Sequence, residues 1–350
     1  MRYINSSNHQ HGNTSKIGIL IVNLGTPTAP NVRAVRAYLR EFLTDPRLVE
    51  LPRPLWWLIL HGLILPFRPA RSARAYQRVW TPAGSPLLVI SKLQLQALRT
   101  ILTENYSDQV QIELGMRYGV PSITDAIANL QHAGVQKLLV LPLYPQYSAT
   151  TTGSVFDAVT SILQRWRVIP ELRFIRSYHT NPLYINALVK SVHQYWDIHG
   201  RPDQLLMSFH GIPKSYTQAG DPYYWQCKQT AELLATALKL DHKCWQMTFQ
   251  SRLGSAEWLT PYTDQQLQSL AQHGTRKVQI ICPGFATDCL ETLDEIAVEN
   301  REYFLHAGGT EYGYIPALNA TSEHITTLAI IIKQHLCGWT NIFDAIDNEI

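Results

Sequence analysis

The sequence repeats itself, in the same order, across its two halves. Four pairs of segments match in their apolar and polar pattern: 17–27 with 205–213, 112–122 with 247–258, 130–142 with 271–283, and 173–185 with 313–325. Both members of the first pair, for example, are an apolar run that ends in G-x-P. Chance similarity between strand–helix units is the alternative, but four matches in one order are hard to obtain by accident. We therefore interpret the chain as two copies of one structural unit.

Each copy alternates apolar strand-like runs with helical stretches such as VFDAVTSILQRW (155–166). This alternation predicts an α/β fold of two similar Rossmann-like domains, each a parallel sheet flanked by helices, with a cleft between them. The predicted units are a polar tail (1–15), an N-terminal domain (16–178) that contains an apolar segment (51–90), a C-terminal domain (179–335) and a second tail (336–350). In such sheets ligands bind beyond the carboxyl ends of the strands, so we expect the site there.

Composition excludes several classes of protein. A formal net charge of +3 without a basic run argues against nucleic acid as a partner. Neither G-x-G-x-x-G nor G-x-x-x-x-G-K-[ST] occurs, so the usual cradles for dinucleotides and triphosphates are missing. The five cysteines form no C-x-x-C pair, and the opening residues lack the apolar segment of a secretory signal. We expect a cytoplasmic protein.

The segment LPRPLWWLILHGLILPFRPARSAR (51–74) is unusually apolar. It is broken by His61, Gly62 and Pro66, and it is too short for a bilayer span, which needs about 20 residues. Trp56 and Trp57, flanked by arginines, suit a membrane interface or the lip of an apolar pocket. A buried core helix is the alternative, because short apolar runs are usually core.

The stretch FATDCLETLDEIAVENRE (285–302) is rich in acids. Asp288, Glu291, Glu295 and Glu299 would form one stripe of an α-helix. Like charges at this spacing cost roughly 0.2–0.5 kcal/mol per pair, so the stripe calls for an explanation. A capping box from Asp288 to Glu291 is the structural alternative, but it leaves Glu295 and Glu299 unexplained.

His210 ends an apolar strand. A hydrogen-bonded core histidine is the ordinary interpretation of such a residue. Together with Glu291, however, a neutral imidazole can share a divalent metal ion or accept protons from a substrate. Two protein ligands leave coordination positions open, which suits a metal ion that is handed over rather than kept.

YPQYSATTTGS (144–154) places hydroxyl groups at a predicted helix N-terminus. Ser148 and its neighbours either cap that helix or bind an anion, with Tyr147 as an aromatic wall. Trp258, Arg78 and Arg117 add aromatic surface and positive charge. A wide planar ligand that carries acid groups would fit this set of side chains.

Several long motifs together resemble one known family: NLGTP, GSP (84–86), YPQYSATTTGS, SFHGIPKSYTQAGDPYYWQC, QSRLGSAEWLTPYTD and FATDCLETLDEIAVEN. The chain is similar to ferrochelatases (protohaem ferro-lyases) over about residues 16–335, and most of all to the Gram-negative bacterial type without an iron–sulfur tail. The resemblance implies insertion of Fe²⁺ into protoporphyrin IX, the last step of haem biosynthesis, in a two-lobed Rossmann-like fold. Both molecules would be substrates, and no permanently bound cofactor is implied.

The resemblance also assigns residues by position. His210 and Glu291 match the family's catalytic and metal-binding pair, and Asp288 and Glu295 match an acidic path for protons or metal. The remaining matches are to residues that bind porphyrin: Arg78, Arg117, Tyr147, Ser148 and Trp258.

Two positions depart from the animal members of the family. Cys289 stands where they carry histidine, which puts a metal relay through this position in doubt. Their cysteine-rich tail has no counterpart here, where only Cys337 lies near the end, so we expect no [2Fe–2S] cluster.

We hypothesise that the enzyme bends the porphyrin so that its central nitrogens become accessible, with His210 accepting protons. A chelatase for coproporphyrin, or one that loads cobalt into sirohydrochlorin, is one alternative. A tetrapyrrole carrier without chemistry is another. The apolar segment 51–74 adds peripheral contact with the inner face of the cell membrane as a further hypothesis.

Overall fold

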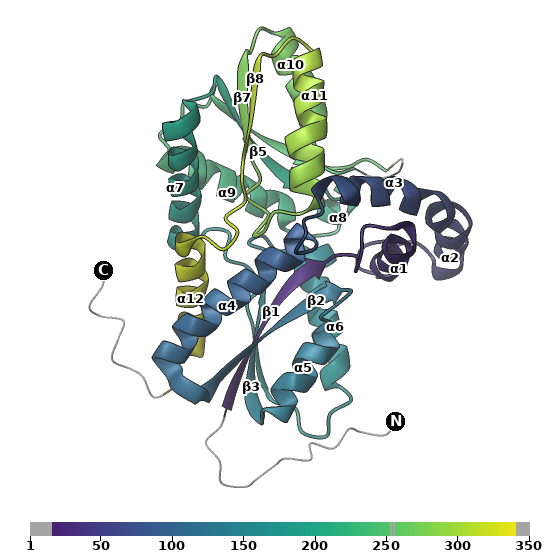
Figure 1. Ribbon diagram of the computed structural model, residues 1–350, viewed down its shortest axis with the longest axis vertical. Helices are drawn as coiled ribbons and strands as arrows, with labels where there is room; N and C mark the ends of the chain where they lie inside the picture. Colours follow the sequence, from purple (N-terminus) through teal and green to yellow (C-terminus); the bar gives the residue numbers. More distant parts are fainter. Residues whose placement is uncertain (1–15, 253, 255, 341–350) are drawn as a thin grey trace.

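The computed structural model describes residues 16–252, 254 and 256–340, and it contains two four-stranded parallel sheets (Figure 1). The first sheet has the strand order β2-β1-β3-β4 and the second the order β6-β5-β7-β8. The strands are β1 (Lys16–Gly25), β2 (Val110–Tyr118), β3 (Val135–Pro142), β4 (Glu171–Phe174), β5 (Gln204–His210), β6 (Trp245–Gln250), β7 (Lys277–Ile281) and β8 (Glu311–Ile315). Both sheets therefore use the same order, and each matched pair of segments contains equivalent strands. The predicted duplication is confirmed.

Helices cover both faces of each sheet (Figure 1). The first half contributes α1 (Val32–Leu43), α2 (Arg53–Ile59), η1 (Leu60–Ile64), α3 (Leu65–Val79), α4 (Pro86–Tyr106), η2 (Ser107–Gln109), α5 (Ile123–His132), η3 (Ala149–Gly153) and α6 (Ser154–Leu163). The second half contributes α7 (Pro182–His199), α8 (Lys214–Gln218), α9 (Tyr223–Ala237), α10 (Thr263–Gln272), η4 (Glu291–Glu299), α11 (Asn300–His306) and α12 (Ser322–Leu336). The elements η1, η3 and η4 are π-helical, whereas η2 is a 3₁₀ turn.

Alternate residues of each strand enter different cores. Ile19 and Ile21 of β1 belong to one large cluster together with Met207 and Phe209 of β5, so this cluster joins the two halves. Leu20 of β1 points the other way, into a smaller core that only the first half builds. Because successive side chains of a strand point to opposite faces, a sheet buried on both sides needs a continuous apolar run. The strands of both halves have that composition.

The end of β1 approaches β2 closely. Gly25 has φ +110°, and a Cβ atom there would lie 1.7 Å from the carbonyl oxygen of Tyr118. Only glycine fits such a conformation and such a distance. The glycine of NLGTP therefore brings the carboxyl ends of two neighbouring strands together at the edge where we expect the site.

The last helix crosses to the other half. Although α12 follows β8, it packs on α4 and β3 of the first half, and it lies beside α4 in Figure 1. Lys333 of α12 donates to Asn105 of α4 at 2.8 Å, and Trp339 donates to Glu171 of β4 at 2.6 Å. The division that we propose between 178 and 179 thus separates the two sheets, but not every helix that covers them.

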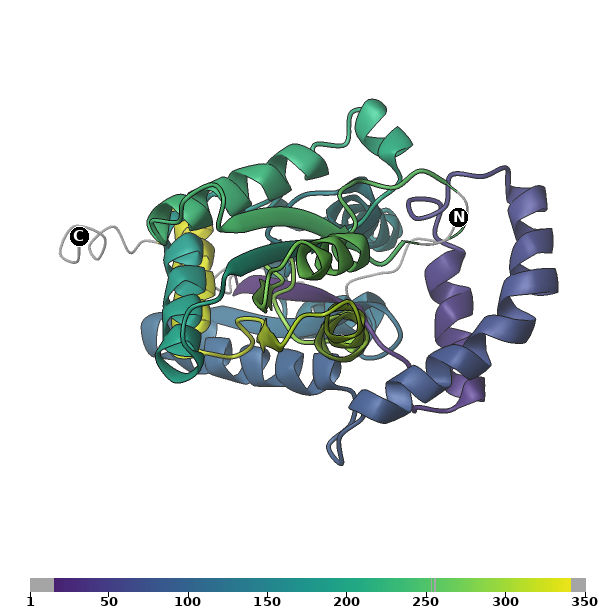
Figure 2. The same ribbon diagram turned by 90° about the horizontal axis from the view of Figure 1, so that it is seen from above.

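Helices α1, α2 and α3, with η1, form a lip that projects from the first half (Figures 1 and 2). The lip has a core of its own, which includes Val35, Trp56 and Tyr76. The indole of Trp56 is buried and donates to the carbonyl of Leu43 at 2.6 Å, whereas Trp57 is 58% exposed. The prediction of a paired tryptophan surface is therefore wrong for Trp56, because one face of α2 must close the lip core. Among the described residues, no helix is long and apolar enough to cross a membrane.

Candidate active site

His210 is the last residue of β5, a central strand of the second sheet. Its Nδ1 lies 2.7 Å from the carbonyl oxygen of Gly211. A carbonyl oxygen only accepts, so Nδ1 carries a proton and, in the neutral ring, Nε2 keeps its lone pair. Trp258 lies directly beside this turn, because a Cβ atom on Gly211 would be 3.2 Å from its indole ring. The structure therefore brings together His210 and Trp258, two of the predicted site residues.

The acidic stretch is not the α-helix that its spacing predicts. Residues Glu291–Glu299 form the π-helix η4, and Asp288 lies in the loop before it. The amide of Asn300 bonds the carbonyl of Glu295, which is the i→i+5 pattern of a π-helix. No side chain caps η4, so the alternative of a capping box is also wrong. The acids therefore do not form the predicted stripe of an α-helix. Contacts with distant parts of the chain stabilise a wider helix than the spacing of the acids indicates.

Glu291 begins η4 and faces the first half of the chain. Burial is the main reason that the pKa of Tyr76 lies well above its ordinary value, and the charge of Glu291 raises it further. Tyr38 of α1 shows the same effects, with Tyr76 as a further cause. Glu291 is thus near enough to the tyrosines at the base of the lip for its charge to act on both.

Glu295, one turn further along η4, is held by Ser251 at the end of β6. The Ser251 amide donates to Oε1 at 2.7 Å, and its hydroxyl group donates to Oε2. Burial raises the pKa of Glu295 to about 7. The hydrogen bonds from Ser251 lower this pKa, and the charge of Glu291 raises it. A carboxyl group that titrates near neutrality can both take up and release protons under cellular conditions.

Asp288 is buried, and both of its oxygens already accept hydrogen bonds. Oδ1 accepts from Tyr314 of β8 and from Thr292 at 3.0 Å, while Oδ2 accepts from Asn319 at 2.7 Å. These partners fix the loop between β7 and η4. The sequence indicated an acid at this place but not that neighbouring side chains would occupy its oxygens.

The two predicted arginines, Arg78 and Arg117, join separate parts of the fold. Arg78 of α3 binds Asp294 of η4 through two hydrogen bonds of 2.6 Å, so it ties the lip to the acidic helix. Arg117 of β2 donates to the buried carboxylate of Asp45 at 2.5 Å and to the hydroxyl of Ser154 at 2.6 Å. Bidentate pairs between guanidinium and carboxylate are among the strongest and most directional in proteins.

Ser148 caps a helix, as one of the two interpretations of its motif predicts. Its hydroxyl oxygen accepts from the Thr150 amide at 3.2 Å at the start of η3, and the hydroxyl also donates to Asp221 at 2.9 Å. Tyr147 lies next to it, with the guanidinium of Arg176 4.7 Å above the ring centroid. These contacts join the end of β3 to the second half.

Comparison with known proteins decides the family. The family model described as ferrochelatase matches residues 16–336. The chain belongs to the ferrochelatase family. A ferrochelatase from Thioalkalivibrio sulfidiphilus is 52% identical over 97% of this chain and 92% of its own length, and one from Nitrosococcus oceani is 52% identical over the same shares. The match thus spans both sheets and the lip of this ferrochelatase.

Solved structures with the same fold are chelatases with little sequence similarity. SirB from Bacillus subtilis with Fe³⁺ has a TM-score of 0.56 at 11% identity, covering 94% of this chain and 99% of its own. CbiX, described as the terminal enzyme of sirohaem biosynthesis in denitrifying bacteria, has a TM-score of 0.50 at 12% identity, covering 91% and 98%. At this identity the likeness concerns the fold alone. Two parallel sheets in one chelatase-like arrangement are therefore shared.

Sequence reasoning did not single out Arg68, which the charge of Glu291 reaches in the folded chain. Burial lowers the pKa of Arg68, while the charge of Glu291 opposes that shift. Its Nη1 is buried and has no hydrogen-bond partner in the structure. A buried, unpartnered guanidinium N–H is costly and marks a place for an acceptor. From sequence, Arg68 was only one of several arginines that flank the apolar segment.

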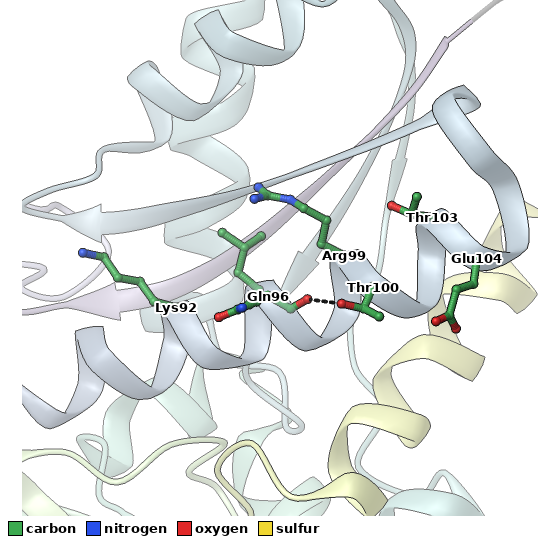
Figure 3. A pocket seen from close by; sticks show the side chains of 7 residues that line it. Lys92, Gln96, Arg99, Thr100, Thr103 and Glu104 are labelled. Atoms are coloured by element: carbon green, nitrogen blue, oxygen red, sulfur yellow. Dashed lines mark hydrogen bonds between the residues drawn. The ribbon is translucent and has the colours of Figure 1, made fainter.

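The surface of α4 carries an open hollow away from these residues (Figure 3). All seven residues that line it, Lys92, Leu95, Gln96, Arg99, Thr100, Thr103 and Glu104, come from this single helix. Because one helix supplies all of its lining, the hollow offers little to enclose a ligand. Among the described residues there is also no cluster of three or more His, Cys, Asp or Glu side chains that could hold a metal ion. A metal ion would meet at most pairs of such groups.

Proposed function

We propose that this ferrochelatase inserts Fe²⁺ into protoporphyrin IX and forms protohaem with release of two pyrrole protons. One observation carries this proposal within the family: His210 keeps its Nε2 lone pair because Nδ1 donates to the Gly211 carbonyl. Glu291 and the near-neutral Glu295 lie on η4, which follows the adjacent strand β7. A base that ends one strand and a carboxyl group that follows its paired strand could together exchange protons for a metal ion.

The roles of the residues follow from this arrangement. Nε2 of His210 accepts a pyrrole proton while Glu291 binds the incoming iron or passes a second proton. Glu295 receives protons from Glu291, because its pKa near 7 allows either state. Asp288 holds the loop that leads to Glu291. Trp258, Tyr147 and the lip enclose the ring between the two sheets, and the energy of these contacts bends it towards the geometry of metal entry.

We further infer that Arg68, more than Arg78, meets an acid side chain of the porphyrin. Both oxygens of Asp294 already occupy Arg78, whereas Nη1 of Arg68 has no partner in the structure. A carboxylate on the ligand would satisfy that atom and pair with its charge. Ser148 and Arg117 would then shape the opposite wall through their contacts with Asp221 and Asp45.

Titration of two variants separates the arginines. Arg68→Met should weaken binding of protoporphyrin IX about tenfold, measured by tryptophan quenching, but leave binding of its dimethyl ester nearly unchanged, since the ester carries no carboxylate. Arg78→Met should change both affinities less than about twofold, because its partner is Asp294. If wild type binds protoporphyrin IX and its dimethyl ester equally, and Arg68→Met changes neither affinity, Arg68 does not bind the porphyrin.

The function itself is tested by anaerobic incubation with protoporphyrin IX and a ferrous salt, followed by visible spectroscopy. We expect the free-base absorbance to disappear and that of protohaem to grow. Parallel incubations with coproporphyrin and sirohydrochlorin, each with Fe²⁺ or Co²⁺, identify the preferred ring and metal. Tight binding of porphyrin without metal insertion would instead favour a tetrapyrrole carrier.

We also propose that the enzyme works in the cytoplasm, in peripheral contact with the cell membrane through the lip. Phe67 is 74% exposed, Leu63 is 63% exposed and Trp57 is exposed as well, so the lip presents at least three large apolar side chains to solvent. An exposed apolar surface flanked by arginines suits an anionic bilayer surface. The apolar side chains of the lip would also allow a porphyrin, whose ring is apolar, to pass directly from the lipid to the enzyme.

Flotation with vesicles that contain anionic lipid tests this contact. Wild type should float with the vesicles, whereas Leu63→Asp combined with Phe67→Asp should remain in the lower fractions and keep its fold. Ile198→Asp is the matched control, since Ile198 is 78% exposed on α7, outside the lip. If wild type stays unbound, or if the control loses binding as fully as the lip variant, the lip is not a membrane surface.

A further inference from the structure

The loop between β7 and η4 is pinned at three consecutive residues. The carbonyl of Ala286 accepts from Gln94 at 3.0 Å, and the hydroxyl of Thr287 accepts from Asn23 at 3.1 Å. The next residue, Asp288, is held by Asn319. Two of these three anchors come from the first half of the chain and one from the turn before α12. The loop is therefore placed relative to both halves before η4 begins.

The contact between Asp288 and Asn319 consists of two hydrogen bonds that run in opposite directions. The Asn319 amide group donates to Oδ2 of Asp288 at 2.7 Å, and the Asp288 backbone amide donates to Oδ1 of Asn319 at 2.8 Å. Together they fix the backbone and the side chain of Asp288 at once. One of these bonds holds the backbone of Asp288 and the other its Oδ2, while Tyr314 and Thr292 hold Oδ1.

Asn319 is itself fixed from behind. Its backbone has φ +50°, a left-handed conformation that asparagine tolerates better than most residues. Its carbonyl oxygen accepts from Gln94 of α4 at 2.9 Å and from Nδ1 of His324 in α12 at 2.7 Å. Both partners are fully buried, and burial lowers the pKa of His324 to about 4, so its ring is neutral at cellular pH. The loop before η4, helix α4 and helix α12 thus all hold Asn319 in place.

This arrangement is an expensive way to pack a core. Oε1 of Gln94 and Nε2 of His324 are buried without hydrogen-bond partners in the structure, and each such atom destabilises the folded state. Apolar side chains would fill the same volume without that penalty. What the polar groups provide, and apolar ones would not, is a fixed direction for the Asn319 carbonyl and through it for Asp288.

We propose that Asn319 is a positioning residue for metal insertion: with Gln94 and His324 behind it, it orients Asp288 and the start of η4 so that Glu291 meets the substrate. The proposal rests on the proposed function. Because Gln94 belongs to α4, the same contact sets the acidic loop at a fixed place relative to the first half, where Tyr38 and Tyr76 face Glu291.

Two variants of Asn319 keep its backbone conformation while they change its side chain. Asn319→Gly tolerates positive φ and deletes both bonds to Asp288. Its kcat for anaerobic insertion of Fe²⁺ into protoporphyrin IX should fall about tenfold or more, while the KM for porphyrin changes less than about twofold, because a misplaced acid affects the chemical step rather than ring binding. Asn105→Ala is the matched control. Asn105 accepts from Lys333 elsewhere on the α4–α12 contact, so its loss should leave kcat unchanged.

Asn319→Asp adds a signature that loss of packing does not produce. A carboxylate would then face Oδ2 of Asp288 at hydrogen-bond distance, and the contact could form only with a shared proton. Relative to wild type, kcat should recover as the pH is lowered from 8 to 6, whereas Asn319→Gly should show no such recovery. The other titratable groups that face this contact are Tyr314 of β8, Cys282 after β7 and His324 of α12.

The outcomes separate this inference from the proposed function. If wild type inserts iron and both Asn319 variants keep its kcat and pH profile, Asn319 is not a positioning residue although the enzyme is a ferrochelatase. If kcat falls only in step with the folded fraction, measured by circular dichroism, the role is purely structural and the inference is wrong. If wild type binds porphyrin but inserts no metal, the proposed function fails and the inference fails with it.

Discussion

The two halves each place a π-helix after the third strand of their sheet, and the two π-helices differ in chemistry. In the first half η3 (ATTTG) follows β3, and in the second half η4 (ETLDEIAVE) follows β7. Ser148 caps η3 with its side chain, whereas no side chain caps η4. The duplicated unit thus supplies the same backbone device twice. In the first half the π-helix carries hydroxyl groups and has a structural role. In the second half it carries carboxyl groups and is part of the candidate active site.

A π-helix needs support from outside, because it is a rare form with little local preference. For η4 that support comes from Arg78 to Asp294, from Ser251 to Glu295, and from the hydroxyl of Tyr312 to the carbonyl of Ile296 at 2.5 Å. Two of these three contacts use the acids themselves. Asp294 and Glu295 therefore help to hold the helix, in addition to the part in proton exchange that we propose for Glu291 and Glu295.

The largest expected effect is on turnover, and it concerns only the second half. His210→Ala and Glu291→Gln should each lower kcat for Fe²⁺ insertion by about 10²-fold or more, since each removes a group to which we assign a part in the proton exchange. Porphyrin affinity should change only modestly. Asp157→Asn, which alters an acid just after η3 that pairs with Arg47, should keep kcat within about twofold.

Normal turnover of folded His210→Ala would show that the imidazole is not the base. Normal turnover of Glu291→Gln would reduce η4 to a structural element like η3. A loss in Asp157→Asn as large as in Glu291→Gln would mean that both π-helices serve the reaction, and the comparison between the halves would no longer hold.

An intermediate effect is expected on stability as a function of pH. Burial raises the pKa of Glu295 from an ordinary 4.5 to about 7, so the folded state holds a proton that the unfolded state releases above about pH 4.5. Stability therefore falls as the pH rises from about 4.5 to 7, by about 3 kcal/mol in all. Glu295→Gln has no charge to bury. Its free energy of unfolding, relative to that of wild type, should therefore be higher at pH 8 than at pH 4.5.

Urea unfolding of both proteins between pH 4.5 and 8 measures that difference in the free energy of unfolding. The variant also loses a bond from Ser251, but this loss lowers its stability by the same amount at each pH. Parallel stability curves for wild type and Glu295→Gln would show that Glu295 is charged in the folded protein. The acid of η4 would then resemble the exposed acids of the first half.

The smallest expected effect belongs to η3. Ser148→Ala removes an N-cap and a bond to Asp221, so it should lower the free energy of unfolding by about 1 kcal/mol. Its kcat should stay within about twofold of wild type. Measurement of both quantities sharpens the contrast, because a large loss of kcat at unchanged stability would show that Ser148 contacts the porphyrin.

Much of the fold could be predicted from local pattern, but the state of the site residues could not. The repeated apolar runs indicated the strands, and the duplication indicated that the two sheets would share one order. The spacing of Asp288, Glu291 and Glu295 predicted an α-helix and was misleading, since neighbours along the chain do not reveal a π-helix that distant contacts hold. Arg68 gave no signal of its own, because its unpartnered atom exists only once the lip has folded.

The amino-acid sequence alone determined the two-sheet architecture, the family, and which chemical groups stand at the ends of the strands. These properties depend on periodicity and residue identity, which are local and can be read along the chain. Only the tertiary structure decided how each group is used. Arg78 meets an acid 216 residues away, and Asp288 accepts a hydrogen bond from Asn319, 31 residues further on. Hydrogen-bond partners and burial are set by contacts between distant segments, and they determine which side chains stay available for a substrate.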